Sequence, residues 1–204
     1  MCNDYFVADF EFTQYSKPVG KPRGFFSEII EIGAVKISGE TNENVGSIQD
    51  FVKPHFYPKQ AKEVMEFCSI TDAHMKTAID FSTMLKKVSQ LYSPGKTYFV
   101  VWGNQDYRVI DNSCSRHNLS NPILFEDCLD LAEAYRLFND DIDTTSLRNA
   151  VEELNINAEG HWHAAYEDAI KTAKILIKLL SDGWKPEHYF SLKMNNIYSD
   201  EKKS

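Results

Sequence analysis

The sequence has no apolar run that approaches the roughly 20 residues of a membrane-spanning helix, so a membrane role would have to come from a partner. It also lacks the apolar segment of a signal peptide, because the first 15 residues carry Asp4, Asp9 and Glu11. Its four cysteines show no C-x-x-C spacing. These absences predict a reduced, cytoplasmic protein.

The sequence also has fewer basic than acidic residues: 22 Lys and Arg against 30 Asp and Glu, which gives a net charge of −8. Nucleic-acid affinity usually comes from Lys and Arg that neutralise phosphates, so this balance argues against broad, non-specific binding of polyanions. Two divalent cations would offset this balance locally by cancelling four carboxylates. With 204 residues and 43% hydrophobic content, we expect one domain over 1–182 and a partly frayed extension over 183–204, although two small domains would also fit.

Hydrophobic patterning predicts three strands first and alternating strands and helices later. Strands are expected at Tyr5–Phe12, Glu28–Ile37, Ile48–Val52, Tyr98–Trp102 and Ile123–Cys128. Helices are expected at Gln60–Phe67, Phe81–Leu91, Gln105–Arg116, Leu129–Phe138, Thr145–Leu154 and Ala164–Leu180. This order predicts an α/β fold in which helices flank a mixed five-stranded sheet.

Two carboxylates lie within the first apolar strand. Asp9 and Glu11 are separated by one residue, so in a strand both side chains point to the same face. Burying two adjacent anions is costly unless each is paired or binds a metal, and no Lys or Arg lies within Tyr5–Thr13. The strand therefore predicts a site for divalent cations.

Three further residues complete the pattern. Asp106 follows the short apolar strand, and His163 precedes Asp168 by five positions just before the last helix. Five residues of an ideal helix rotate by about 140° beyond a full turn, so His163 and Asp168 cannot share a face if both are helical. We therefore expect His163 on the loop before the helix. A lone D-x-E is more often an edge strand and a lone H-x-x-x-x-D often arises by chance, but their ordered combination favours a nuclease site.

The motifs resemble those of a known family. The segments Asp9–Thr13, Trp102–Asp106 and His163–Ala169 are similar to the three motifs of the DEDDh family, the proofreading-type 3′-to-5′ exonucleases of the ribonuclease H-like fold. Val52–Pro54 and Phe67–Thr71 resemble its KapD-like and histone-mRNA exonuclease subgroup. The likeness spans roughly residues 5–180 and includes all five catalytic positions. It implies the ribonuclease H-like fold and a metal-dependent hydrolase that releases nucleoside 5′-monophosphates from a free 3′ end.

The chemistry of such a site assigns a role to each residue. In a two-metal site, ions about 4 Å apart clamp the attacking and leaving oxygens of a phosphoryl displacement. Asp9, Glu11, Asp106 and Asp168 are the predicted metal ligands, and their hard oxygens suit two Mg²⁺ ions, for which Mn²⁺ can substitute. His163 is the predicted general base for the attacking water, because histidine titrates near neutrality.

Substrate contacts rest on weaker patterns. The resemblance implies that Phe12 and Thr13 touch the 3′-terminal nucleotide, although Phe12 could equally be a core aromatic residue. The basic segment Lys17–Arg23 could steer a phosphate backbone or could be a solvated loop. His161 is interpreted as a surface residue. Three lysines at helical spacing are expected on the solvent face of the last helix: Lys171, Lys174 and Lys178.

The predicted substrate is single-stranded nucleic acid, with RNA favoured over DNA because of the subgroup likeness. Recognition of RNA needs a partner for the 2′-hydroxyl, and the main chain after Glu11 is placed to offer one. A DNA-directed proofreading or repair exonuclease is the alternative within enzymes. A non-catalytic nucleic-acid-binding regulator is a second alternative, which the complete set of five residues disfavours.

Overall fold

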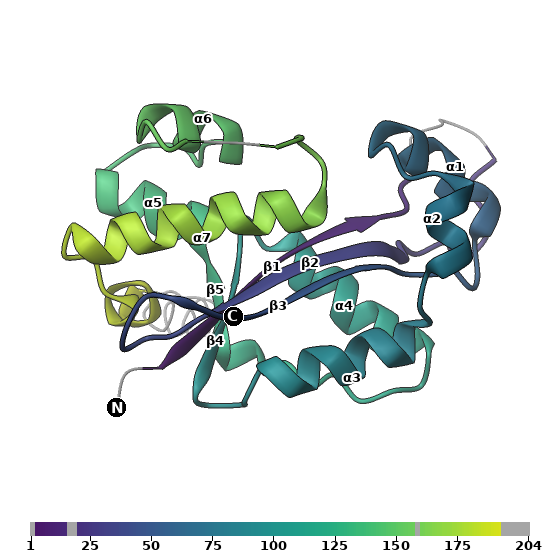
Figure 1. Cartoon of the computed structure of the whole chain (residues 1–204), viewed down its shortest axis with the longest axis horizontal. Coiled ribbons are helices and arrows are strands. Elements are labelled where there is room, and N and C mark those ends of the chain that lie inside the picture. The colour runs from purple at the N-terminus through teal and green to yellow at the C-terminus, as the bar shows by residue number, and fades with distance from the viewer. Residues whose placement is uncertain (1–2, 16–19, 158–159, 193–204) are drawn as a thin grey trace, which may run out of the picture.

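The computed structural model of the chain describes residues 3–15, 20–157 and 160–192. A five-stranded sheet lies at its centre, in the order β3-β2-β1-β4-β5 (Figure 1). The strands are β1 (Asp4–Phe12), β2 (Ile29–Ile37), β3 (Asn44–Phe51), β4 (Thr97–Val101) and β5 (Cys128–Asp130). The first three are antiparallel neighbours, whereas β4 pairs in parallel with both β1 and β5. The predicted α/β fold with a mixed five-stranded sheet is confirmed.

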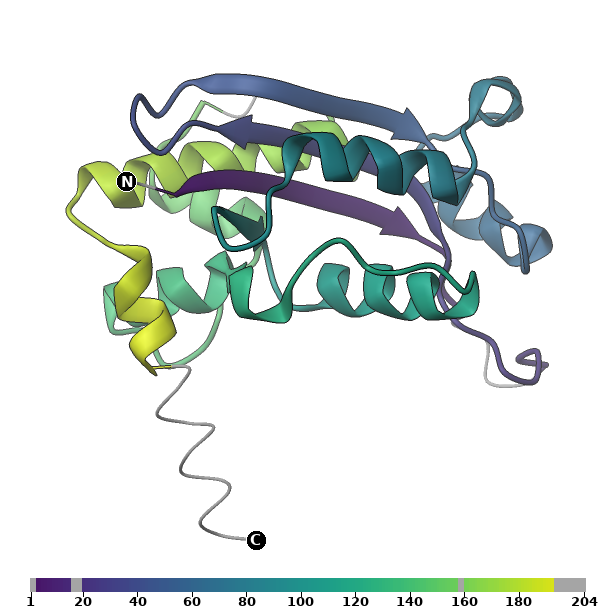
Figure 2. The same cartoon turned by 90° about the horizontal axis from the view of Figure 1, so that it is seen from below.

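Helices cover both faces of this sheet. They are α1 (Pro58–Phe67), α2 (Asp72–Thr77), α3 (Phe81–Leu91), α4 (Gln105–Arg116), α5 (Leu131–Asn139), α6 (Leu147–Glu153) and α7 (Ala165–Ser181), with a short 3₁₀ turn η1 (Phe125–Asp127). Helices α3 and α4 pack on one face, and α5, α6 and α7 pack on the other (Figures 1 and 2). Helices α1 and α2 lie at the end of the sheet where β1 ends (Figure 1).

Alternation along β1 sorts its side chains between two hydrophobic cores. Phe6, Ala8 and Phe10 join the cluster built with α3 and α4. Tyr5 and Val7 join the cluster built with α5, α6 and α7. Because successive strand residues point to opposite faces, the two acids of the D-x-E motif continue the second series. They therefore project toward the face that α7 covers.

A glycine lets α7 approach the sheet at this point. Gly33 of β2 is the direct partner of Asp9 across the strand pair. A Cβ atom at Gly33 would lie 2.0 Å from the backbone nitrogen of Tyr166 and 2.1 Å from the carbonyl carbon of Ala165. Real Cβ contacts of this kind are near 3.4 Å or longer. The first turn of α7 therefore rests directly on the backbone of β2, beside the motif.

Two predicted boundaries were wrong around β5. The strand was expected at Ile123–Cys128, but η1 occupies Phe125–Asp127 and β5 follows it at Cys128–Asp130. The next helix begins at Leu131 instead of Leu129, because the Asp130 carboxylate caps it by accepting the N–H groups of the second and third helical residues. An N-cap aspartate within an apolar stretch was the missed signal.

Helix α2 was not predicted, and β3 begins four residues before the expected Ile48. Strand β3 is an edge strand with three of its first four residues exposed, so its first half shows no hydrophobic alternation. The division expected at residue 182 remains a prediction, and residues 193–204 lie outside the described part. Trp184, which follows the expected boundary, is only 3% exposed and packs with α7. In the described part, no helix is both long and apolar enough to cross a membrane.

The replacement Gly33→Ala is expected to destabilise the fold by about 1–3 kcal/mol or more, because overpacking forces α7 away from β2. Gly46→Ala in β3 is the matched control, since its added Cβ would meet the mobile end of Leu91 at 2.9 Å instead of backbone atoms. Urea unfolding of both variants measures the difference. Equal stability of the two would contradict the direct contact between α7 and β2.

Candidate metal centre and active site

The D-x-E carboxylates lie side by side on the α7 face of the sheet. Asp9 and Glu11 are both half-buried near the end of β1. Their cross-strand partners in β2 are Gly33 and Glu31, so Glu11 has a second glutamate directly beside it. The strand register shifts between Glu11 and Phe12, and such irregularities often occur next to active sites.

Asp106 reaches the same place from α4. It lies in the first turn of that helix and is 7% exposed. Its Oδ1 accepts the backbone N–H of Phe10, at 3.0 Å. Since Phe10 stands between Asp9 and Glu11, this hydrogen bond fixes the third carboxylate against the first two. Asp106 thus takes its position from a strand 96 residues earlier in the chain.

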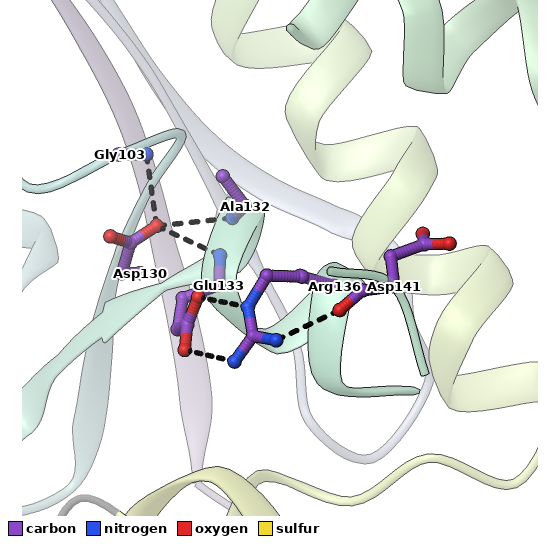
Figure 3. A network of polar contacts seen from close by, with 6 residues as sticks. All are labelled: Gly103, Asp130, Ala132, Glu133, Arg136 and Asp141. Carbon is purple, nitrogen blue, oxygen red and sulfur yellow. Dashed lines mark hydrogen bonds and ion pairs between the residues drawn. The ribbon is translucent and has the colours of Figure 1, made fainter. Parts of the chain in front are cut away.

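A hydrogen-bond network holds the turn that leads to Asp106 (Figure 3). The Oδ1 atom of Asp130 accepts three backbone N–H groups, from Gly103 at 3.0 Å, Ala132 at 3.1 Å and Glu133 at 3.2 Å. One carboxylate therefore caps α5 and fastens the turn after β4. Beyond it, the Glu133 carboxylate receives two hydrogen bonds of 2.7 Å from the Arg136 guanidinium. The network makes the entry to α4 part of a rigid framework.

Asp168 comes from the first turn of α7 and carries two fixed contacts. Its Oδ2 accepts the backbone N–H of His163 at 3.0 Å, and its Oδ1 pairs with Lys171 Nζ at 2.9 Å. Lys171 also donates to the carbonyl oxygen of His161 at 3.0 Å and lies 4.3 Å from the centre of the Trp162 ring. A single lysine thus joins the helix to the loop that precedes it.

The predicted position of Lys171 on the solvent face was wrong. Its side chain is 1% exposed, whereas Lys174 and Lys178 are exposed as expected. Long side chains of a helix point back toward its N-terminus, which directs Lys171 to Asp168 and the preceding loop. Burial of this ammonium is tolerable because it is paired with a carboxylate and hydrogen-bonded. Helical spacing alone does not show that a loop folds over the first turn.

His163 lies on the turn just before α7, where the sequence placed it. Its backbone is left-handed, with φ at 62°. Its ring is exposed and lies 4.5 Å, centre to centre, from the ring of Phe67 at the end of α1. Phe67 is itself 65% exposed. The imidazole is therefore accessible at the rim of the site, and an exposed aromatic side chain stands beside it. His161 is exposed.

The structure brings the predicted acids together with residues that the sequence analysis missed. Glu31 is 5% exposed beside Glu11, and the Cys68 thiol makes a hydrogen bond to Glu11. Glu31 could have been predicted, because it is a glutamate within the apolar segment of β2. Nothing in the neighbouring sequence indicated a role for Cys68. Below, the acidic cluster means these five carboxylates: Asp9, Glu11, Glu31, Asp106 and Asp168.

Crowding raises the pKa values of this cluster. Burial, followed by the charges of neighbouring carboxylates, raises the pKa of Asp9 well above its ordinary value. Burial raises the pKa of Asp106 to about 7 against the hydrogen bond from Phe10, and raises that of Glu31 to about 7 with the charge of Glu11 added. Burial also raises the pKa of Glu11, although the Cys68 thiol and His163 oppose it.

These features fit divalent cations. Glu11, His163 and Asp168 each offer one ligand atom within 4.8 Å of the other two, a separation that one ion can bridge. Within the described part of the chain, Lys171 forms the ion pair with the acidic cluster, through Asp168. One ammonium cannot offset five carboxylates, so the cluster favours bound cations, and its oxygen-rich composition suits Mg²⁺ or Mn²⁺.

The predicted substrate residues follow directly after the D-x-E acids. Phe12 is half-buried and packs against the α3 and α4 core. Thr13 is fully buried, and its hydroxyl accepts the backbone N–H of Glu28 at 2.9 Å. The Thr13 side chain is therefore engaged in joining β1 to the segment before β2. Substrate contact by these two residues remains a prediction. The basic segment 17–23 lies partly outside the described residues.

Comparison with known proteins gives a family match over most of the chain. The RNase T family, described as "Exonuclease", matches residues 6–176. The chain is 33% identical over 180 residues to "Probable 3'-5' exonuclease KapD" of Bacillus subtilis (strain 168), a match that covers 87% of this chain and 84% of that protein.

Two further relatives extend the comparison. The chain is 25% identical over 185 residues to 3'-5' exoribonuclease 1 of mouse (Mus musculus). The match covers 87% of this chain and 53% of the mouse protein. It also superimposes, with a TM-score of 0.76 and 25% identity, on the nuclease domain of 3'hExo, "a DEDDh family member, bound to rAMP". That alignment covers 89% of this chain and 94% of the solved one. The ribonuclease H-like DEDDh fold is confirmed.

The metal-free protein is expected to become less stable as pH rises. Asp106 and Glu31 have ordinary pKa values of 3.8 and 4.5, and both are raised to about 7 in the fold. The folded state therefore holds extra protons, and the stability they confer is present below about pH 4 and lost as pH rises through 7. Melting in EDTA should show a decline between about pH 5 and pH 8. Saturating Mg²⁺ should make this decline with pH smaller, because the ion binds the ionised cluster and stabilises the fold at high pH. A rise over this range would contradict the raised pKa values.

The replacement Lys171→Met is expected to lower the free energy of unfolding by about 3 kcal/mol, because it leaves the Asp168 carboxylate buried without its partner. Lys174→Met is the matched control on the same helix, since Lys174 is exposed and donates to a main-chain carbonyl oxygen. Urea unfolding in EDTA compares the two variants. Similar stability would show that Lys171 does not fasten the start of α7.

Proposed function

The chain belongs to the RNase T exonuclease family and is a 3′-to-5′ exonuclease, and we propose that it degrades single-stranded RNA with two Mg²⁺ ions bound at the acidic cluster. The observation that supports this proposal is the convergence of four carboxylates from three elements near the end of β1. Asp9 and Glu11 come from β1, Asp106 from α4 and Asp168 from α7. Mn²⁺ can take the place of Mg²⁺ at such oxygen ligands.

The reaction is an in-line displacement at the terminal phosphodiester. A water oxygen forms a bond to phosphorus, the bond from phosphorus to the 3′ oxygen of the preceding nucleotide breaks, and that oxygen leaves with a proton. The products are a nucleoside 5′-monophosphate and a strand shortened by one nucleotide. Two divalent cations, when bound, supply charge stabilisation for the attacking and leaving oxygens.

His163 accepts the proton of the attacking water. The residue lies at the rim of the site with an exposed ring, and its own backbone N–H bonds to Asp168. The turn that carries the imidazole is thus fixed to a predicted metal ligand. A ring nitrogen of an imidazole can accept a proton, which is what the role of general base requires. The exposed ring of Phe67 beside it offers a face on which the terminal base can stack.

The preference for RNA rests on two supports. The relatives include a protein named as an exoribonuclease, and one solved relative is bound to rAMP. In this chain the strand ladder is irregular between Glu11 and Phe12, where a main-chain group can serve the 2′-hydroxyl. Phe12 and Thr13 flank the position of the 3′-terminal nucleotide in this proposal.

Matched 5′-labelled RNA and DNA strands, incubated with Mg²⁺ or EDTA, test the proposal. We expect stepwise shortening from the 3′ end, faster with RNA, stalled by a 3′-phosphate and abolished by EDTA. Asp9→Asn is the control for contaminating nuclease and should lose nearly all activity while melting no lower than the metal-free wild type, because it relieves repulsion. Equal turnover of RNA and DNA would reject the RNA preference, and faster turnover of DNA would support the DNA-directed alternative. Binding without hydrolysis would support the regulator.

The replacement His163→Ala is expected to reduce the single-turnover rate by roughly 10²–10⁴, because it removes the proton acceptor. His161→Ala is the matched control: its ring is exposed two residues away, and its contact with Lys171 runs through the main chain, which the change retains. The rates are compared at saturating Mn²⁺ across pH. A larger loss of rate in His161→Ala than in His163→Ala would show that His163 is not the general base.

A further inference from the structure

Three segments that are distant in sequence meet beyond the end of β1 and form a continuous cluster of rings. The Phe26 ring lies 5.1 Å from Phe56 and 5.4 Å from Tyr57, while Phe25 lies 4.9 Å from Tyr57. On the other side, the Phe56 ring lies 5.0 Å from His117 at the end of α4. We call this cluster the aromatic platform; it comprises Phe25, Phe26, His55, Phe56, Tyr57 and His117.

The platform combines a buried ring with exposed ones, since Phe26 is only 7% exposed. Phe56 is 41% exposed, and His55, which contacts both Phe56 and His117, is exposed as well. Burial lowers the pKa of His117, and His55 beside it adds to the effect while Glu28 opposes it. The His117 ring is therefore mostly uncharged at neutral pH. Neutral aromatic rings at a surface are suited to stacking with flat partners.

Two of the three segments that form the platform carry charge opposite to that of the whole protein. Residues 20–27 and 53–62 contain five Lys or Arg and no Asp or Glu, in a chain whose net charge is −8. Two exposed cations also lie over the rings themselves: Lys21 Nζ is 5.5 Å from the centre of Phe25, and the Arg116 guanidinium is 5.2 Å from that of Phe26. The acid that follows the first segment, Glu28, is 3% exposed.

Buried Glu28 makes the platform rigid. Its carboxylate accepts the backbone N–H groups of His55 at 2.6 Å, Phe56 at 2.9 Å and Tyr57 at 2.5 Å. The Tyr57 hydroxyl donates to the carbonyl oxygen of Gly24 at 3.1 Å, which joins the two segments. The rings are therefore held in place before any ligand arrives, so little conformational entropy is lost on binding.

The same glutamate connects the platform to the catalytic strand. Thr13 donates its backbone N–H to the carbonyl oxygen of Glu28 at 2.8 Å, and its hydroxyl accepts the N–H of Glu28. Glu31, the cross-strand partner of Glu11, lies three residues after Glu28. At about 3.3 Å per strand residue, the Cα atoms of Glu28 and Glu31 are about 10 Å apart. Figure 1 shows α1 and the end of β1 at this same end of the sheet.

We propose that the aromatic platform binds the nucleotides that lie 5′ of the terminal nucleotide of a single-stranded substrate, with bases stacked on its rings and phosphates near Lys21 and Arg116. This proposal rests on the proposed exonuclease function. The combination of exposed rings with cations in an otherwise acidic protein matches a ligand that has flat bases and a negative backbone. Stacking is tolerant of sequence, so the platform selects single strands and not a particular sequence.

Binding and hydrolysis of strands of different length test the platform. Anisotropy of a labelled strand of about ten nucleotides is measured in an Asp106→Asn background, which prevents hydrolysis. We expect Phe56→Ala to weaken binding by between about five-fold and one-hundred-fold and Phe56→Trp to retain it. Arg116→Gln should reduce the slope of log affinity against log salt by about 0.7. In enzymes with Asp106 intact, Phe56→Ala should raise KM for the long strand more than for a dinucleotide, which offers a single nucleotide 5′ of the terminal one.

Two controls match the variants elsewhere on the surface. Phe138→Ala removes a ring that is 40% exposed at the end of α5, and Lys86→Gln removes an exposed charge on α3. Unchanged binding in both platform variants would overturn the proposal, as would an equal loss of dinucleotide and long-strand hydrolysis in Phe56→Ala. If the wild type hydrolyses neither substrate, the exonuclease proposal fails, while the anisotropy still reports whether the platform binds the strand. Retained melting temperatures and the Phe56→Trp variant separate loss of binding from loss of folding.

Discussion

Repulsion among carboxylates that cannot separate is the constraint on which the site depends. Five acids face one another between the sheet and two helices, and burial and the four neighbouring carboxylates all raise the pKa of Asp9. The fold fixes two of them with donors: the Phe10 N–H holds Asp106, and the His163 N–H and Lys171 hold Asp168. These contacts determine where the oxygens point and leave most of the negative charge uncompensated. The strain is removed when cations bind, so the same repulsion that weakens the metal-free protein strengthens its affinity for metal.

The positions of the acids come from regular structure, whereas the base comes from a turn. Strands and first helical turns hold side chains more precisely than loops do. His163 has a left-handed backbone, which costs a non-glycine residue on the order of 1 kcal/mol. The hydrogen bond from its N–H to Asp168 and the contact of Lys171 with the His161 carbonyl offset this cost. The turn is therefore coupled to a metal ligand, and any shift at the start of α7 moves both groups together.

Patterns within a few residues allowed the sequence to predict the sheet, most helices and the elements that carry the acids. Alternation in β1 was sufficient to place Asp9 and Glu11 on one face. The five-residue spacing was sufficient to place His163 before the helix. What could not be predicted depends on contacts between distant segments. Nothing in the periodicity of α7 shows that a loop covers Lys171, and nothing near Cys68 indicates that its thiol reaches Glu11.

The distribution of charge explains how an acidic protein can act on a polyanion. Before metals bind, the acidic cluster repels the phosphates of a substrate, so the first attraction must come from another part of the surface. The cations at the platform, Lys21 and Arg116, can supply it, and the platform is hydrogen-bonded to Glu28, which lies three residues before Glu31. Because Glu28 ties the platform to the strand that carries Glu11, attraction and catalysis share one rigid support. A flexible basic tail would attract the strand equally well but would not fix its direction toward the acids.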